Sequence, residues 1–151
     1  MPELGPRSIE TRRQDALYRL GHDEDAWVAT TDTDTGAPRL TPLSFLWHQD
    51  TLLLATTANG LTGRNLAANP SVQLGIGLTR DVVLVQGAVE VIAVDALDPA
   101  LGDAFAAKAG FEPRRPSSPY AYFRVTPRSI QVWREEDELT DRWVMRAGVW
   151  R

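Results

Sequence analysis

The sequence contains no cysteine, which excludes disulfides, thiol nucleophiles and cysteine-ligated metal sites. Among its 16 basic residues only Lys108 is a lysine, so a Schiff-base mechanism has one possible residue. The two histidines, His22 and His48, are too few for a three-histidine metal site. The side chains that usually carry chemistry are therefore scarce, and the sequence assigns neither a catalytic residue nor a metal site.

An excess of positive charge and long apolar runs are missing as well. The formal net charge is −4 at pH 7 and the isoelectric point is about 5.1, whereas a nucleic-acid surface depends on cations that neutralise phosphates. No stretch approaches the roughly 20 apolar residues of a membrane span, and residues 1–7 lack the apolar run of a secretion signal. We expect a cytoplasmic protein without a nucleic-acid or membrane partner.

The length of 151 residues predicts a single domain. Within it we expect three segments: an N-terminal helical segment (1–25), a barrel core (26–134) and a C-terminal segment (135–151). In the first segment, Ser8 is a suitable N-cap and Gly21 a suitable end for an amphipathic helix with Leu17 on its apolar stripe.

Strand patterns dominate from residue 26 onward. We expect strands over 26–32, 39–47, 51–56, 71–79, 82–94, 120–126 and 129–134, helices over 98–110 and before Asn69-Pro70, and a final hairpin over 143–150. Gly87 lies midway along a strand that is too long to stay flat, where a bulge is expected, and Pro127-Arg128 is typical of a turn. Because the turns between successive strands are too short for parallel crossovers, the six or seven strands predict a mainly β fold with flanking helices, an antiparallel sheet closed into a small barrel.

The segment 56–70 is the strongest candidate for a binding site. It leaves an apolar strand, crosses a small polar loop that includes Thr57 and Gly60, and enters a short helix that must end before Asn69-Pro70. Free backbone N–H groups at a helix start, threonine hydroxyls and the guanidinium of Arg64 together favour an anion. The same composition also fits an ordinary connector helix with Arg64 in solvent.

Two blocks of sequence change the weight of these alternatives. They are GRNLAANP (63–70) and TRDVVLVQG (79–87), and they follow LLLAT (52–56) in that order. With this order and spacing the chain resembles the pyridoxamine 5'-phosphate oxidase-like FMN-binding split-barrel superfamily over about residues 26–134. More narrowly, it is similar to the small actinobacterial members that use FMN or the deazaflavin coenzyme F-420.

The resemblance implies an antiparallel split barrel that forms a homodimer, with cofactor grooves at the subunit interface. It places the strand from Arg39 to Phe45 along the isoalloxazine ring, which assigns three residues to the cofactor: Arg39, Thr41 and Leu43. The cofactor phosphate would contact the next strand end and helix, at Thr56, Thr57, Thr62, Arg64 and Asn65. Many relatives carry a Ser-Arg-Lys or Ser-x-Lys run where this chain has Gly60-Leu61-Thr62, so one or two cationic contacts are missing. That departure inclines the cofactor prediction slightly toward the deazaflavin over FMN.

The implied function is that of a flavin- or deazaflavin-dependent oxidoreductase, which transfers a hydride between the bound cofactor and a small unsaturated substrate. The missing cations keep an alternative open, a non-catalytic split barrel that binds or sequesters a cofactor or another ligand. A haem-binding protein on the same scaffold would need His22 or His48 as its axial ligand.

Other conspicuous residues have structural explanations. The pair Arg12-Arg13 and the acidic run 135–138 are expected to lie on solvated faces. Tyr122 could flank a substrate, although core or interface packing explains it as well. Gly75 and Gly77 leave space beside their strand that a partner subunit, a cofactor ring or the barrel's own backbone could fill.

Overall fold

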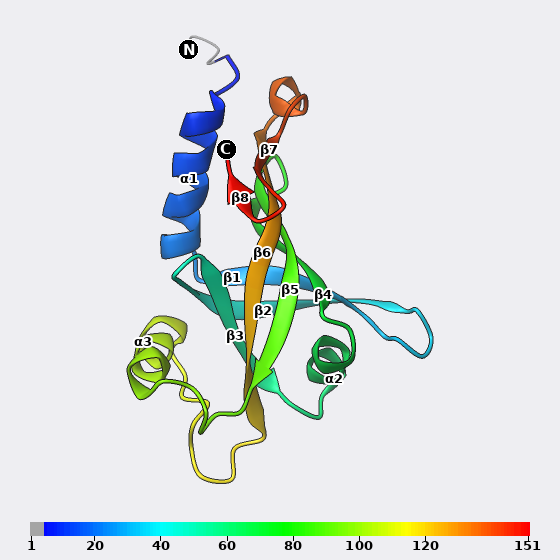
Figure 1. The fold of residues 1–151 in the computed structure, drawn as a ribbon, viewed down its shortest axis with the longest axis vertical. Helices are drawn as coiled ribbons and strands as arrows, with labels where there is room; N and C mark the ends of the chain where they lie inside the picture. Colours follow the sequence, from blue (N-terminus) through cyan, green and yellow to red (C-terminus); the bar gives the residue numbers. More distant parts are fainter. Residues whose placement is uncertain (1–4) are drawn as a thin grey trace.

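A computed structural model describes residues 5–151, and it contains three α-helices and eight strands in that range (Figure 1). In chain order the elements are α1 (Ile9–His22), β1 (Asp25–Thr31), β2 (Pro38–His48), β3 (Thr51–Thr57), α2 (Leu61–Ala68), β4 (Ser71–Leu78), β5 (Asp81–Ile92), α3 (Pro99–Ala109), β6 (Tyr120–Arg134), the short 3-10 helix η1 (Glu136–Glu138), β7 (Trp143–Arg146) and β8 (Val149–Trp150). The expected cap is confirmed, because the Ser8 side chain accepts a hydrogen bond from the backbone N–H of Thr11. The helix ends one residue after Gly21, at His22.

Six strands close into an antiparallel barrel. The strand order is β3-β2-β1-β4-β5-β6, and β3 also pairs with β6, which joins the two ends of the sheet. Strands β7 and β8 continue the sheet beyond β6. The predicted fold class, a mainly β antiparallel barrel with flanking helices, is therefore confirmed. No helix within residues 5–151 is long and apolar enough to cross a membrane.

The longest strands bend where the sequence contains glycine and proline. The pairing of β5 with β6 shifts register between Gln86 and Gly87, so the expected bulge is confirmed. The predicted turn at Pro127-Arg128 is wrong, because β6 runs without a break from Tyr120 to Arg134. Pro127 lies opposite Gly87 at the bulge, where a residue without an N–H group can be tolerated inside a strand.

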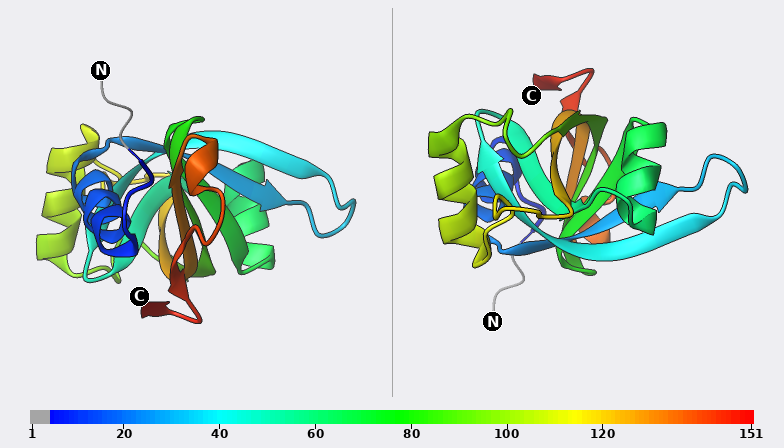
Figure 2. Two further views of the ribbon diagram at one scale, coloured as in Figure 1. Left: turned by 90° about the horizontal axis from the view of Figure 1, so that it is seen from above. Right: turned by 90° about the horizontal axis from the view of Figure 1, so that it is seen from below.

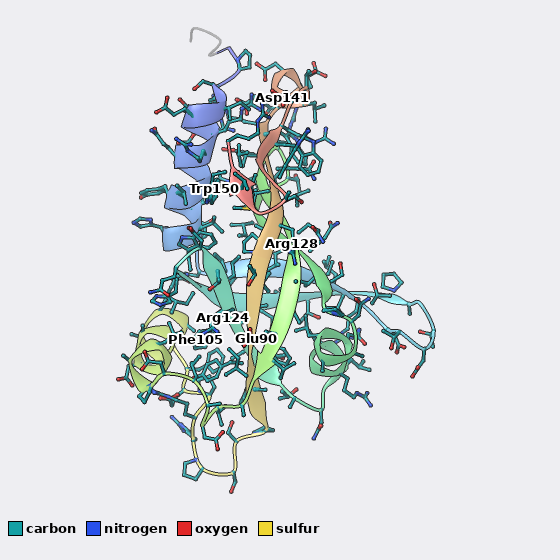
Figure 3. All side chains as sticks on the ribbon, viewed as in Figure 1. Glu90, Phe105, Arg124, Arg128, Asp141 and Trp150 are labelled. Atoms are coloured by element: carbon teal, nitrogen blue, oxygen red, sulfur yellow. The ribbon has the colours of Figure 1, made fainter. Side chains whose placement is uncertain are left out.

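Apolar side chains form two clusters, one inside the barrel and one beneath α3. Strand β3 contributes to both: Leu52 and Leu54 face the interior, while Leu53 and Ala55 face α3. Phe105 reaches from α3 toward these outward-facing residues (Figure 3). Strand β3 is therefore apolar on both of its faces.

Helix α1 is held against one end of the barrel by arginines, which corrects two expectations. Arg12 is buried, and its guanidinium donates to the backbone oxygens of Arg7, Glu138 and Asp141. Glu138 is only 1% exposed and pairs with Arg7, so the acidic run is not wholly solvated. The predicted solvation failed because α1 packs beside β7 and near η1, segments more than 100 residues away along the chain. Leu17, expected on the buried stripe, is exposed.

The β1–β2 hairpin projects from the barrel (Figure 2). Strand β1 pairs with β4 only over residues 27–29, and β2 pairs with β3 only over residues 45–48. Beyond those points each strand has only the other as a partner. We call the projecting part, residues 30–41, the arm. Pro42 lies at its base, where one edge of β2 is unpaired, as expected for proline in a strand.

Candidate functional site

Helix α2 begins almost directly on the end of β3. A Cβ atom on Gly63 would overlap the carbonyl oxygen of Thr57 and would lie 2.9 Å from that of Ala58. Only a residue without a side chain therefore allows the first turn of α2 to rest on the backbone of the connection. A Cβ on Gly60 would meet the Thr57 hydroxyl, so this hydroxyl also lies beside the start of the helix.

The N-terminus of α2 has no side-chain cap. Gly60 occupies the N-cap position and makes no side-chain hydrogen bond, because it has no side chain. The N–H groups of a helical first turn have no partner within the helix, and they give that end a partial positive charge. This end of α2 therefore favours a hydrogen-bond acceptor with negative charge.

Three polar side chains meet at this helix end. The Arg39 guanidinium donates through Nε to the Thr62 hydroxyl at 3.0 Å, and the hydroxyls of Thr41 and Thr62 lie 2.9 Å apart. Arg39 and Thr41 are two residues apart on β2 and therefore share a face, while Thr62 is 5% exposed. We call these three residues the Arg39–Thr62 cluster.

The hydrogen-bonding capacity of the cluster suits an anion. Thr62 accepts from Arg39, and if Thr41 donates to it as well, the remaining group of Thr62 is its O–H donor. The other guanidinium N–H groups of Arg39 have no acidic partner among the residues that the structure describes. Arginine is always charged and matches phosphate oxygens with paired donors. The donor set therefore fits a phosphate group.

Asn65, also on α2, makes a different contact. Its Nδ2 donates to the Thr30 hydroxyl on β1 at 3.2 Å, and both side chains are buried. The buried polar and charged residues within 5–151 are Arg12, Thr30, Thr62, Asn65 and Glu138. Three of these five lie where α2 meets the arm, so most of the buried polar residues are gathered at this junction.

The other predicted cofactor residues are distributed around this junction. Arg64 is exposed and makes no side-chain hydrogen bond within residues 5–151. Leu43 is half-buried and packs against the barrel core. Thr56 and Thr57 are both half-buried, and as neighbours on β3 they point to opposite faces, so only one of them can face a given ligand group. The cofactor role of all eight residues stays a prediction.

Thr30 is the residue of the junction that the sequence pattern did not single out. It occupies a position in the inward-facing series of β1, after Ala26 and Val28. A hydroxyl in such a series was the available signal, because a buried polar group needs a partner. Which partner it finds depends on how α2 packs against the arm, and no local pattern contains that information.

The remaining candidates lie elsewhere. Tyr122 packs edge-on against Phe105 beneath α3, and its buried hydroxyl has no partner within the described chain. Burial raises the pKa of this hydroxyl.

The space beside Gly77 is filled by the Arg19 guanidinium, and a methyl group of Leu84 lies beside Gly75. In residues 5–151 no group of three or more histidine, cysteine, aspartate or glutamate side chains could hold a metal ion.

Comparisons with known proteins relate this architecture to solved structures. Residues 19–134 match the family described as pyridoxamine 5'-phosphate oxidase. An F-420 reductase is 21% identical, with a TM-score of 0.62 over 75% of this chain and 93% of the other. General stress protein 26 from Bacillus anthracis is 17% identical, with a TM-score of 0.65 over 80% and 92%. A FAD-binding protein from Mesorhizobium loti is 20% identical, with a TM-score of 0.56 over 78% and 90%. No curated protein matches the sequence.

Proposed function

The chain belongs to the pyridoxamine 5'-phosphate oxidase family, and from this premise we propose that it is a flavin- or deazaflavin-dependent oxidoreductase whose Arg39–Thr62 cluster binds the cofactor phosphate. The observation that carries the proposal is the cluster itself, where a cation, two hydroxyls and an uncapped helix end converge. The similar structures named F-420 reductase and FAD-binding protein support a redox cofactor of this class. FMN and the deazaflavin coenzyme F-420 are the two candidates.

The chain's own residues would bind and orient the cofactor. Arg39 would supply the fixed positive charge and Thr62 a hydroxyl donor, with Thr41 holding that hydroxyl in place. Leu43, on the same face of β2 as Arg39 and Thr41, would lie along the ring system. When bound, the ring would exchange a hydride with a small unsaturated substrate and water would supply or accept the accompanying proton, so no nucleophile or base of the protein is required. This accounts for the scarcity of reactive side chains.

Arg39 is expected to matter more than Arg64 for phosphate binding. Replacing Arg39 by Gln removes a charge-assisted hydrogen bond, which should weaken FMN binding by about 1.5–3 kcal/mol, roughly ten- to a hundredfold. The matched variant Arg64→Gln removes the same charge from an arginine whose side chain makes no hydrogen bond within residues 5–151, and it should change the affinity less than about threefold. Titration of each purified variant with FMN, followed by flavin fluorescence, measures the effect.

Riboflavin provides the second arm of this experiment, because it has the ring of FMN without the phosphate. Arg39→Gln should leave riboflavin binding unchanged. A variant that weakens both ligands equally would contradict phosphate recognition by Arg39. If the unchanged protein binds neither FMN nor the deazaflavin at micromolar concentration, the oxidoreductase proposal fails. Binding without any hydride transfer would favour the non-catalytic alternative.

We also infer that two copies of the chain pair through the outer face of β1 and β2. Trp27 and Leu40 are 53% and 61% exposed, and register places Trp27 opposite Pro42 and Ala29 opposite Leu40, so these residues share one face. An exposed patch of large apolar side chains typically marks an interface. Arg39 lies on the opposite face of the arm from Leu40, so a partner on this face would lie across the arm from the cofactor site.

A charge on this face should separate the two copies. Trp27→Glu would place a carboxylate in the interface, and we expect a monomer by light scattering where the unchanged protein is a dimer. Val149→Glu is the control, because Val149 is also highly exposed but lies on β8. A Trp27→Glu protein that still dimerises at low micromolar concentration would place the interface elsewhere.

A further inference from the structure

Four polar residues join α2 to the arm through two hydrogen bonds. Thr62 and Asn65 are three residues apart on α2 and therefore lie on one helix face. Thr30 and Arg39 are directly opposite each other in the register of β1 and β2. Asn65 donates to Thr30, and Arg39 donates to Thr62, so each residue of the helix contacts one strand of the arm.

From this arrangement we propose that Asn65 and Thr30 are positioning residues, which hold the Arg39 guanidinium against Thr62 and do not themselves contact the anion. The proposal rests on the function inferred for the Arg39–Thr62 cluster and adds the residues that fix its geometry. Asn65 donates its Nδ2 group to Thr30, and Thr30 faces Arg39 across the strand pair.

The arm depends on the Asn65–Thr30 hydrogen bond because each of its strands has only the other strand as a partner. Beyond Ala29, β1 pairs only with β2, and at Arg39 the strand β2 pairs only with β1. A two-stranded hairpin alone is marginally stable in water, so its position relative to α2 depends on contacts such as these. A binding group must be held to within about 0.5 Å of its productive position. Loss of the Asn65–Thr30 bond would therefore let Arg39 move away from Thr62.

If Asn65 and Thr30 only stabilised the fold, their hydrogen bond would not be needed. The free energy of a neutral hydrogen bond is small, and an apolar pair of the same shape could replace it at little cost. Two separate polar contacts here join one helix face to two paired strands, and both involve buried groups on α2. Polar pairs of this kind specify one arrangement among several similarly packed ones.

The test replaces the Thr30 hydroxyl and measures its effect on Arg39. Thr30→Val keeps the side-chain shape and removes the acceptor of the Asn65 bond. We expect FMN binding to weaken about three- to tenfold and the Arg39 Nε–H group to exchange faster with water by NMR. Thr30→Ser restores a hydroxyl and should restore both values. Thr31→Val makes the same chemical change on the next residue, which points to the opposite face of β1, and should alter neither.

A double-mutant comparison separates positioning from general stability. In the Arg39→Gln background, Thr30→Val should cause no further loss of FMN affinity, because the group that it positions is absent. An equal loss in both backgrounds would overturn the proposal. Arg39 Nε–H exchange that is the same in Thr30→Val as in Thr31→Val would also overturn it. If the unchanged protein binds neither FMN nor the deazaflavin, the proposed function fails, and the exchange rate of Arg39 alone decides the positioning role.

Discussion

Replacing Glu138 by Gln should destabilise the protein by about 3 kcal/mol, because it breaks a buried ion pair and leaves the Arg7 guanidinium with only its more exposed partners Asp15 and Asp81. The Glu138 carboxylate accepts from the backbone N–H groups of Arg7 at 2.7 Å and Arg134 at 2.6 Å, and from the Arg7 guanidinium at 2.7 and 2.9 Å. Glutamine has one acceptor oxygen and would turn its amide donors toward these donors. Urea unfolding measures the difference in free energy.

An exposed neighbour provides the control. Glu136→Gln makes the same chemical change two residues earlier, on a side chain that is exposed and makes no ion pair among the described residues. It should change the free energy of unfolding by less than about 0.5 kcal/mol. If Glu138→Gln were as stable as Glu136→Gln, the buried pair with Arg7 would contribute nothing to stability.

The same pair predicts how stability depends on pH. Burial raises the pKa of the Glu138 carboxyl, but hydrogen bonds from the side chain and backbone of Arg7 and from the Arg134 backbone outweigh it and lower the pKa from 4.5 to about 2. The folded state therefore favours the ionised carboxyl. This contribution, about 3 kcal/mol at 1.36 kcal/mol per pKa unit, is fully present above pH 4.5. It declines as the pH falls toward 2, so the stability difference between the protein and Glu138→Gln should shrink over that range.

Replacing Gly63 by Ala should also have a large effect, for a steric reason. The new methyl group would overlap the carbonyl oxygen of Thr57 and approach that of Ala58, and backbone oxygens cannot rotate away as side chains do. Helix α2 would have to move off the end of β3, at a net cost of about 1–3 kcal/mol in unfolding free energy. Because Thr62 is the neighbouring residue, FMN binding should weaken as well. Chemical unfolding and FMN titration of the variant measure the two effects.

Gly21 makes the opposite prediction for the same substitution. It lies in the last turn of α1, and no atom lies within 4 Å of the position that a Cβ would take there. Alanine has a higher helix propensity than glycine by about 1 kcal/mol, so Gly21→Ala should be neutral or stabilising. A Gly63→Ala protein that behaved like Gly21→Ala would show that α2 does not rest on the β3 connection.

The elements of the fold were predictable because their signals are local. The Ser8 cap and the bulge at Gly87 each depend on the properties of a few adjacent residues. The predicted turn that divided β6 at Pro127 was wrong because it also relied on a local signal alone. Proline usually interrupts a strand, and only the opposing register shift in β5 allows it here.

The candidate site was only partly predictable. The sequence identified the helix start at 60–65 and the strand that carries Arg39, but it did not show which side chains meet. In the structure Arg39 reaches the Thr62 hydroxyl from β2. Thr30 and Asn65 become partners only through the packing of α2 on the arm. Likewise, Glu138 is buried because the N-terminal segment with Arg7 packs against it. The two residues are more than 100 positions apart in the sequence.

The closure of the barrel has a consequence for folding kinetics. Strand β3 pairs with β6, so Leu52 meets Val125 only after most of the chain is available. Contacts so distant in sequence form slowly, because a long loop must close before any of them is made. Until then the apolar β3 presents an unpaired edge, which can add to the edge of another chain. Refolding should therefore be slow and sensitive to protein concentration, whereas the hydrogen bonds of Arg39 and Thr30 to α2 join residues within 30–65 and can form before closure.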